Sequence, residues 1–243
     1  MIPRFLVDRI PPRARVAKRA LLGWMHGEPE LHLATRLCAP SEIAIDVGAN
    51  TGVYAWHLAR RAAAVIAFEP QPDLAAFLRA ALGRNVRVEE VALSDTAGEA
   101  ILRVPSDRMA TGRATIEAAN ALEEFEAREV RVTARRLDDY GLRSVGLIKI
   151  DVEGHELAVI DGAEALLARE RPNLIVEAED RHRTNAPAAV RARLADFGYR
   201  GFIWRNGALT AIDDERALIG CRTNNFVFIA RPEVRAALDL PAR

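Results

Sequence analysis

Two short stretches of this chain change abruptly from apolar to charged residues and then enter a glycine-containing turn. The first is Ile43-Ala-Ile-Asp-Val-Gly-Ala-Asn-Thr-Gly52, in which an apolar strand ends close to the carboxylate of Asp46. Gly48 and Gly52 have no Cβ, so the backbone can adopt unusual dihedral angles and a ligand can lie directly against it. The helix expected over residues 52–61 begins with unpaired N–H groups that point toward that ligand. This pattern is typical of a nucleotide-type cofactor pocket at the carboxyl end of a first strand.

The spacing of the glycines indicates which cofactor fits. Dinucleotide-binding folds use G-x-G-x-x-G to bring the backbone against a pyrophosphate, whereas here three residues separate Gly48 from Gly52 and a carboxylate precedes them. A carboxylate favours a cationic ligand, and S-adenosylmethionine carries an ammonium and a sulfonium but no phosphate. Glu69 ends the next apolar run, where it can accept hydrogen bonds from both ribose hydroxyls. NAD enzymes share that feature, so an NAD-dependent oxidoreductase is the alternative, which Asp46 and the glycine spacing disfavour.

The second stretch, Leu147-Ile-Lys-Ile-Asp-Val-Glu-Gly-His-Glu156, repeats the order of apolar strand, charged turn and helix. Open α/β sheets place their chemistry at the carboxyl ends of parallel strands. Because side chains alternate along a strand, Lys149 and Asp151 are expected on the same side of the sheet. We therefore predict that Lys149, Asp151 and His155 are the candidate catalytic residues and converge beside the reactive end of the cofactor.

Simpler roles stay open for the same charged residues. Asp151 and Glu153 are also suited to capping the following helix, Glu156 is a typical first-turn carboxylate, and His155 could face solvent. A cluster of Asp, Glu and His can bind a divalent cation. The spacing matches no specific metal template, so we predict no metal site.

Composition and length fit an α/β domain. The chain has 243 residues, 50% of them hydrophobic, and a formal net charge of +0, which does not indicate a nucleic-acid partner. Cys38 and Cys221 match no zinc or redox spacing, so we expect buried free thiols in a reducing cytoplasm. Residues 1–30 lack the apolar core of a signal peptide, and no run is long enough to span a bilayer. We therefore expect a soluble, cytoplasmic protein.

Strand and helix patterns alternate from residue 43 onward, which predicts a parallel sheet with right-handed crossovers. The expected strands are 43–47, 65–69, 86–91, 147–151, 173–177, 199–204 and 225–230. The expected helices are 52–61, 72–82, 156–168 and 187–197. Residues 98–138 read instead as an inserted β-hairpin whose polar stretch, 105–120, forms a lid over the cofactor.

We expect three parts along the chain: a helical appendage over residues 1–40, a main domain over 41–232 and a tail over 233–243. Within the appendage, residues 13–25 form a basic amphipathic helix. Such a helix more often packs on its own domain or on a sister subunit, but it can also lie on an anionic membrane. A homo-oligomer and a peripheral membrane contact through residues 13–25 both stay open.

Five sequence blocks occur in a defined order along residues 42–230. They are Asp46-Val-Gly-Ala-Asn-Thr-Gly52, Phe68-Glu-Pro-Gln-Pro72, Ala92-Leu-Ser-Asp95, Arg136-Leu-Asp-Asp139 and Ile148-Lys-Ile-Asp-Val-Glu-Gly-His-Glu156. Together these blocks resemble the FkbM family, whose members are S-adenosylmethionine-dependent methyltransferases acting mostly on oxygen.

The resemblance implies an α/β fold of the class I, Rossmann-like methyltransferase type, with a mostly parallel seven-stranded sheet, helices on both faces and the inserted hairpin. It implies the cofactor S-adenosyl-L-methionine, bound by Asp46, Gly48, Ala49, Asn50, Gly52, Glu69, Val91, Ala92 and Asp151. In this arrangement Glu69 holds the ribose, Val91 and Ala92 lie against the adenine, and Asp151 lies at the methyl-transfer end. The family pattern assigns no catalytic base.

The reaction expected from these residues is O-methylation of a hydroxyl on a small molecule, a sugar or glycan, or a natural-product intermediate. Alignment of acceptor and methyl group supplies most of the rate. Asp151 or His155 is placed to accept the hydroxyl proton, with Lys149 or Glu177 orienting it. The alternative is a non-catalytic S-adenosylmethionine-binding protein of the same fold, against which the number of buried charges argues.

Overall fold

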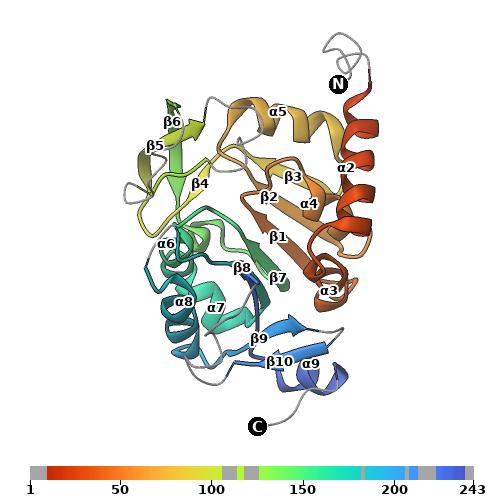
Figure 1. Ribbon diagram of the computed structural model, residues 1–243, viewed down its shortest axis with the longest axis vertical. Coiled ribbons are helices and arrows are strands. Elements are labelled where there is room, and N and C mark those ends of the chain that lie inside the picture. The colour runs from red at the N-terminus through yellow and green to blue at the C-terminus, as the bar shows by residue number, and fades with distance from the viewer. Residues whose placement is uncertain are drawn as a thin grey trace.

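The computed structural model describes residues 10–105, 114–117, 126–181, 184–205, 208–212 and 223–238. Strands and helices alternate along the chain and build a central sheet covered by helices, with a smaller sheet beside it (Figure 1). The strands are β1 (Ile43–Val47), β2 (Ala64–Phe68), β3 (Val86–Glu89), β4 (Ala92–Leu93), β5 (Gly98–Pro105), β6 (Ala127–Arg135), β7 (Val145–Ile150), β8 (Asn173–Glu177), β9 (Arg200–Arg205), β10 (Ala208–Ala211) and β11 (Asn225–Ile229). The helices are α2 (Pro12–His26), α3 (Glu30–Leu37), α4 (Val53–Leu58), α5 (Pro72–Ala81), α6 (Glu156–Asp161), α7 (Glu164–Glu170), α8 (Ala186–Ala195) and α9 (Pro232–Ala237), with a 3-10 turn at Leu137–Tyr140.

The central sheet has eight strands in the order β10-β9-β11-β8-β7-β1-β2-β3. β3, β2, β1, β7 and β8 run parallel, whereas β11 is antiparallel to both of its neighbours and β10 is antiparallel to β9. The mostly parallel α/β sheet is therefore confirmed. The expected count of seven strands is wrong, because residues 208–211 form an additional edge strand. That strand has only four residues, and its pairing with β9 defines it better than its own pattern does.

The order of strands reverses between β1 and β7. From β1 the chain moves outward to β2 and β3, and it later returns to the other side of β1 as β7. Such a switch point leaves a crevice at the carboxyl ends of the two central strands, where open α/β sheets bind their ligands. Both of the charged turns identified in the sequence lie in this crevice, because they directly follow β1 and β7.

Alternating strand residues fill two hydrophobic cores, one on each face of the sheet. On β1, Ile45 and Val47 belong to the core under α6, α7 and α8, whereas Ala44 belongs to the core under α3, α4 and α5. Asp46 is paired in register with Lys149 of β7, so both side chains point toward the α3–α5 face. They are 3% and 1% exposed. Two ionisable groups thus occupy positions that would otherwise be apolar.

The inserted hairpin is confirmed as antiparallel β5 and β6, which form the smaller sheet together with β4. The expected strand over 86–91 is shorter than predicted, because β3 ends at Glu89 and the chain then turns into β4. Of the predicted lid, only residue 105 and residues 114–117 belong to the described part of the chain. Thr115 pairs with Arg103 of β5, so this piece folds back along the hairpin.

One helix differs from the prediction, whereas Cys38 agrees with it. The helix expected over 156–168 is divided into α6 and α7 near Gly162, where a Cβ would lie 2.0 Å from the carbonyl oxygen of Ser94. The close approach of Ser94, which the local sequence does not reveal, explains why a residue without a Cβ is required here. Cys38 is a buried free thiol, whereas Cys221 lies outside the described residues.

The N-terminal helices cover the face that carries Asp46 and Lys149. α2 begins at Pro12, a residue suited to the first helical turn, and packs on α4 and α5. α3 packs on α4, β7 and β8. Among the helices of the described chain, none combines the length and apolar character needed to cross a membrane.

Candidate active site

Two adjoining cavities open at the carboxyl ends of the central strands. The first is lined by the turn after β1, by Glu69 and the residues that follow it, and by parts of the smaller sheet. The second is lined by the same turn, by Asp46 and Lys149, and by residues from α2, α3 and their connection. Gly48, Asn50 and Asp151 line both cavities. The two glycine-containing turns therefore form the boundary at which the cavities meet.

Gly48 is required by the approach of these two turns. Its φ is +78°, and a Cβ at this position would lie 1.9 Å from the carbonyl oxygen of Asp151. Gly52 also has a positive φ, of +82°, but a Cβ there would meet Leu78 of α5 at 2.7 Å. Gly52 lines neither cavity. The structure therefore places Gly48, Ala49 and Asn50 at the candidate site. Gly52 lies outside both cavities, next to Leu78 of α5.

Asp46 carries an unsatisfied buried oxygen. Its Oδ2 has no hydrogen-bond partner within the described protein, and burial raises the pKa of this carboxyl to about 7 although the charge of Lys149 opposes the shift. Buried polar atoms are normally hydrogen-bonded, and Asp46 lines the second cavity. The site therefore fits a ligand that presents a donor, such as an ammonium group.

Glu69 is held rigidly at the end of β2. Its Oε2 accepts a hydrogen bond from the backbone N–H of Asn50 at 2.7 Å, and its Oε1 accepts one from Gln71 at 2.9 Å. Burial nevertheless raises the pKa of Glu69 to about 7, outweighing both hydrogen bonds. A carboxylate with two such bonds retains free lone pairs. Glu69 shares the first cavity with Val91 and Ala92.

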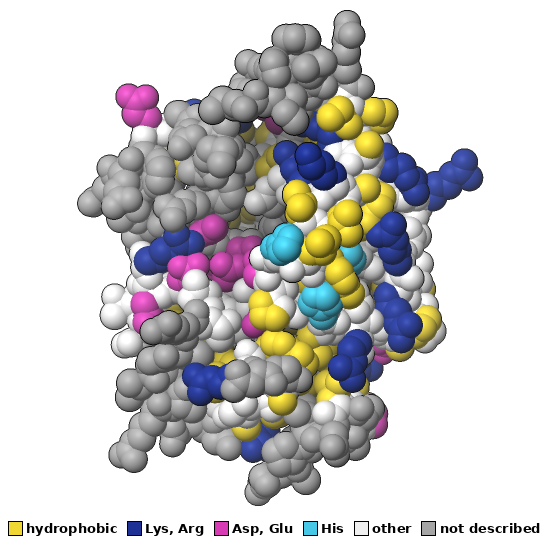
Figure 2. Space-filling view, turned by 45° about the vertical axis from the view of Figure 1, so that its right-hand side comes forward, with side chains coloured by type: hydrophobic (Ala, Val, Ile, Leu, Met, Phe, Trp, Pro, Cys, Tyr) yellow, Lys and Arg dark blue, Asp and Glu magenta, His cyan; other side chains and the backbone are white. Residues whose placement is uncertain are grey.

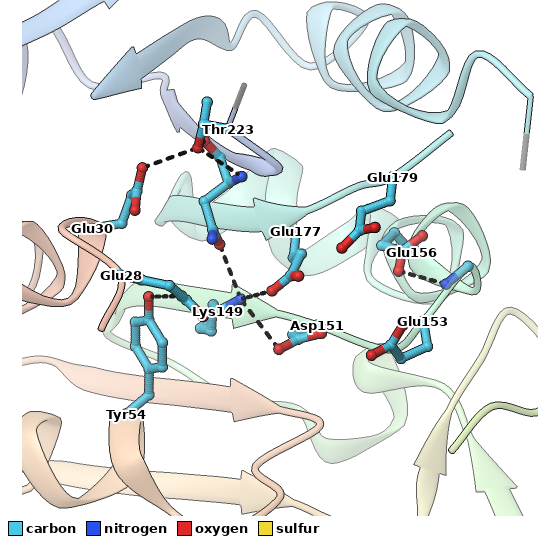
Figure 3. Close-up of polar contacts among 12 residues, drawn as sticks. Glu28, Glu30, Tyr54, Lys149, Asp151, Glu153, Glu156, Glu177, Glu179 and Thr223 are labelled. Carbon is cyan, nitrogen blue, oxygen red and sulfur yellow. Dashed lines mark hydrogen bonds and ion pairs between the residues drawn. The ribbon is translucent and has the colours of Figure 1, made fainter. Parts of the chain in front are cut away.

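Lys149 lies at the centre of a buried polar cluster (Figure 3). Its ammonium lies 3.7 Å from Asp151 Oδ2, 3.7 Å from Glu177 Oε2 and 3.3 Å from Asn225 Oδ1. Burial lowers the pKa of Lys149, but the neighbouring carboxylates outweigh it and the net shift is upward. Burial and the charge of Asp151 raise the pKa of Glu177. The lysine is therefore a fixed cation that orients Asp151 and Glu177.

The aromatic ring of Tyr54 covers the same cluster. The Lys149 ammonium lies 5.1 Å from the ring centroid, and the hydroxyl donates a 2.7 Å hydrogen bond to Glu28 Oε2. Burial, together with the charge of Glu28, raises the pKa of Tyr54 well above its usual value. Glu28 belongs to the short connection between α2 and α3, and no spacing in the sequence marks it as part of a site.

His155 lies apart from this cluster, along the first cavity. Its Nε2 is 2.9 Å from Ser94 Oγ, and its Nδ1 is 3.3 Å from Glu117 Oε2. The sequence does not predict these two partners, because Ser94 follows β4 and Glu117 lies between β5 and β6, both far from His155 along the chain. Of the three predicted catalytic residues, the structure brings Lys149 and Asp151 together and places His155 against the hairpin.

The remaining acidic residues of the second turn have local partners. Glu156 Oε1 accepts a hydrogen bond from the N–H of Gly154 at 2.8 Å, and Glu153 lies 3.5 Å from Arg181. Within the described residues, no group of three or more His, Cys, Asp or Glu side chains is arranged to hold a metal ion.

Comparison with known proteins identifies the family. A model of the methyltransferase FkbM domain matches residues 46–200, which include both glycine-containing turns and every residue that lines the first cavity. The chain belongs to the FkbM methyltransferase family. The resemblance seen in the five sequence blocks is thereby confirmed.

Two relatives show how far the similarity of this FkbM-family chain extends. The 2-O-methyltransferase NoeI of Sinorhizobium fredii (strain NBRC 101917 / NGR234) is 32% identical over 150 residues, covering 54% of this chain and 61% of that protein. The 31-O-demethyl-FK506 methyltransferase FkbM of Streptomyces tacrolimicus is 30% identical over 157 residues, covering 51% of this chain and 60% of that protein. The alignments thus span about three-fifths of these relatives.

A solved structure of the same family shares the fold. Methyltransferase FkbM from Methylobacillus flagellatus KT superposes with a TM-score of 0.53 at 17% identity, covering 93% of this chain and 57% of that chain. The match covers most of the FkbM-family chain. It supports a class I methyltransferase fold.

Proposed function

We propose that this protein transfers a methyl group from S-adenosylmethionine to a hydroxyl oxygen of a small-molecule or glycan acceptor. The observation that carries the proposal is the unsatisfied, buried Oδ2 of Asp46 beside a cavity at the switch point of the sheet. Methylation of oxygen is supported by two relatives. NoeI is named a 2-O-methyltransferase, and FkbM of S. tacrolimicus is named a 31-O-demethyl-FK506 methyltransferase.

The residues of the two cavities fit the cofactor piece by piece. Asp46 would accept a hydrogen bond from the ammonium of the methionine part, while the backbone of residues 48–50 lies alongside it. Glu69 would accept hydrogen bonds from the ribose, and Val91 and Ala92 would pack on the adenine. When bound, S-adenosylmethionine supplies an activated methyl group on its sulfonium.

Asp151 is the residue that we propose to act on the acceptor. It lines both cavities, and its side chain is 34% exposed, whereas that of Lys149 is only 1% exposed. The Asp151 carboxylate would hold the acceptor hydroxyl and receive its proton as the new carbon–oxygen bond forms. Lys149 is a positioning residue, because its buried ammonium holds the Asp151 carboxylate through an ion pair. His155 would instead fix the hairpin over the first cavity.

Calorimetric titration with S-adenosylhomocysteine tests the cofactor assignment, with NAD as the control ligand. We expect binding of S-adenosylhomocysteine with a Kd on the order of micromolar and no binding of NAD. Binding of NAD instead would contradict the proposal, and so would the absence of binding by either ligand.

Asp151→Asn tests the proposed role in proton transfer. Once an acceptor has been found by screening hydroxylated small molecules with methyl-labelled cofactor, we expect the variant to lose about tenfold or more in turnover. Its affinity for S-adenosylhomocysteine should change little. Asp73→Asn, a change at a carboxylate whose side chain is 89% exposed on α5, serves as the control. Turnover equal to that of the unmodified protein would exclude a catalytic role for the Asp151 charge.

A further inference from the structure

The exposed apolar side chains of this protein gather at one helix. Of the five large hydrophobic residues that are exposed in the described chain, four lie between residues 10 and 25. They are Ile10, Leu21, Leu22 and Met25, at 39%, 58%, 49% and 60% exposure. Scattered hydrophobic residues are normal on protein surfaces, but a contiguous group marks an interaction site.

Helical spacing explains how α2 carries this group. Val16 and Ala20, four residues apart, are fully buried on the side that packs on α4 and α5. Leu21, Leu22 and Met25 share the opposite face because they are one, three and four residues apart. The helix therefore has two apolar faces, and the described residues of the protein cover only one of them.

Positive charge surrounds the uncovered face. α2 contains Arg13, Arg15, Lys18 and Arg19 and no acidic residue, although the whole chain has a formal net charge of +0. The basic character is therefore local to this helix. Figure 2 shows hydrophobic side chains gathered over this region with Lys and Arg side chains around them.

The arginines that border the face lie along aromatic rings. Arg15 and Arg19 lie 5.0 and 5.5 Å from the ring centroid of Phe77, and Arg13 lies 5.8 Å from that of Trp56. The guanidinium groups of these arginines thus lie over aromatic rings of α4 and α5, where α2 packs on those two helices. Basic residues beside exposed leucines are typical of helices that lie in a membrane interface.

We propose that the exposed face of α2 binds an anionic lipid surface. Leu21, Leu22 and Met25 would enter the boundary between headgroups and acyl chains, and the basic residues would contact lipid phosphates. Charge favours lipid over a second copy of this chain. A symmetric dimer through this face would bring together two helices that each carry four basic and no acidic residues.

The same helix also borders the second cavity of the candidate active site. Gly23, together with Gly27 and Glu28 just after the helix, lines the second cavity. Lipid binding through the outer face of α2 would therefore bring that cavity close to the membrane surface. The lipid contact itself does not depend on methyl transfer, so it can be tested without an acceptor.

Co-sedimentation with vesicles tests this proposal. We expect the protein to bind vesicles made of equal parts phosphatidylglycerol and phosphatidylcholine about tenfold more strongly than vesicles of phosphatidylcholine alone. Raising the salt concentration should weaken this binding, because it screens the basic residues. Failure to bind the phosphatidylglycerol vesicles would overturn the proposal.

Matched variants separate the apolar contact from the charged one. The triple change Leu21→Ser, Leu22→Ser and Met25→Ser should reduce vesicle binding about tenfold or more, and Lys18→Glu should reduce it and weaken its salt dependence. The controls are Ile101→Ser and Arg131→Glu, which alter an exposed apolar residue and an exposed basic residue of the hairpin. They should bind as the unmodified protein does.

All variants must first show the same thermal unfolding and the same affinity for S-adenosylhomocysteine as the unmodified protein. Equal loss of lipid binding in the triple variant and in the Ile101→Ser control would contradict the assignment to α2. Light scattering measures the oligomeric state and so tests the competing explanation, a dimer formed through this face. A dimer that the triple variant dissociates would assign this face to a second copy of the chain and overturn the lipid proposal.

Discussion

Asp46 and Glu69 are two carboxyl groups that the fold removes almost completely from water. Each is 3% exposed, and burial raises the pKa of each to about 7. Because these values lie above those of the unfolded chain, the ligand-free protein holds protons that the unfolded chain would release. This contribution to stability is full at low pH and is lost as the pH rises toward 7. A cationic ligand group beside Asp46 would offset the loss.

Asp46→Asn tests that reasoning at a single residue. The charged carboxylate attracts the ammonium of the cofactor, and its protonated form does so much less. We therefore expect the variant to bind S-adenosylhomocysteine about tenfold more weakly than the unmodified protein at about pH 8, and to differ much less at about pH 6. Calorimetric titration at the two pH values measures this difference.

The position of the carboxyl is checked by the same titrations. An equal loss of affinity at both pH values would mean that the substitution acts through packing rather than charge. Unchanged affinity at both would mean that Asp46 does not contact the cofactor.

At the scale of elements, the site depends on how closely the turns after β1 and β7 approach each other. Gly48 permits this approach in two ways, through its positive φ and through the absence of a Cβ that would lie 1.9 Å from the Asp151 carbonyl oxygen. The turn after β7 positions Asp151, so a displacement at Gly48 would move both the cofactor side and the acceptor side of the site.

Gly48→Ala is accordingly expected to destabilise the protein by about 3 kcal/mol or more, because it combines backbone strain with a collision against main chain. Gly98→Ala is the matched control, since a Cβ at that glycine of β5 would meet nothing within 4 Å. We expect the control to change stability by no more than about 1 kcal/mol. Urea unfolding measures both, and similar values for the two variants would show that the turns can separate without cost.

At the scale of the whole molecule, the site is assembled from parts that are distant in the sequence. The connection between α2 and α3 supplies Glu28, the turn after β1 supplies Gly48, β7 leads to Asp151, and the hairpin supplies Glu117 beside His155. The sheet brings the two turns together, and the N-terminal helices close the second cavity. One face of α2 thereby borders the second cavity, while the described residues leave the opposite face exposed.

Local sequence was sufficient for the central part of this architecture. β1 and β8 occur at the predicted residues, and β2 and β7 begin and end within two residues of prediction, because continuous apolar runs ending in charged turns define them. The alternation of side chains along β7 correctly predicted that Lys149 and Asp151 lie together. The family resemblance rested on five sequence blocks that include the turns after β1 and β7. The glycines and carboxylates of these blocks are recognisable without a structure.

Tertiary structure decided what local patterns do not encode. β10 depends on its pairing with β9, the requirement for glycine at residue 162 depends on the approach of Ser94, and the location of His155 depends on Ser94 and Glu117. Glu28 reaches Tyr54 only because α2 and α3 pack over the sheet. A residue's neighbours in sequence determine its preferred backbone and its burial, but contacts between distant segments follow from the order of the strands and from which faces remain to be covered.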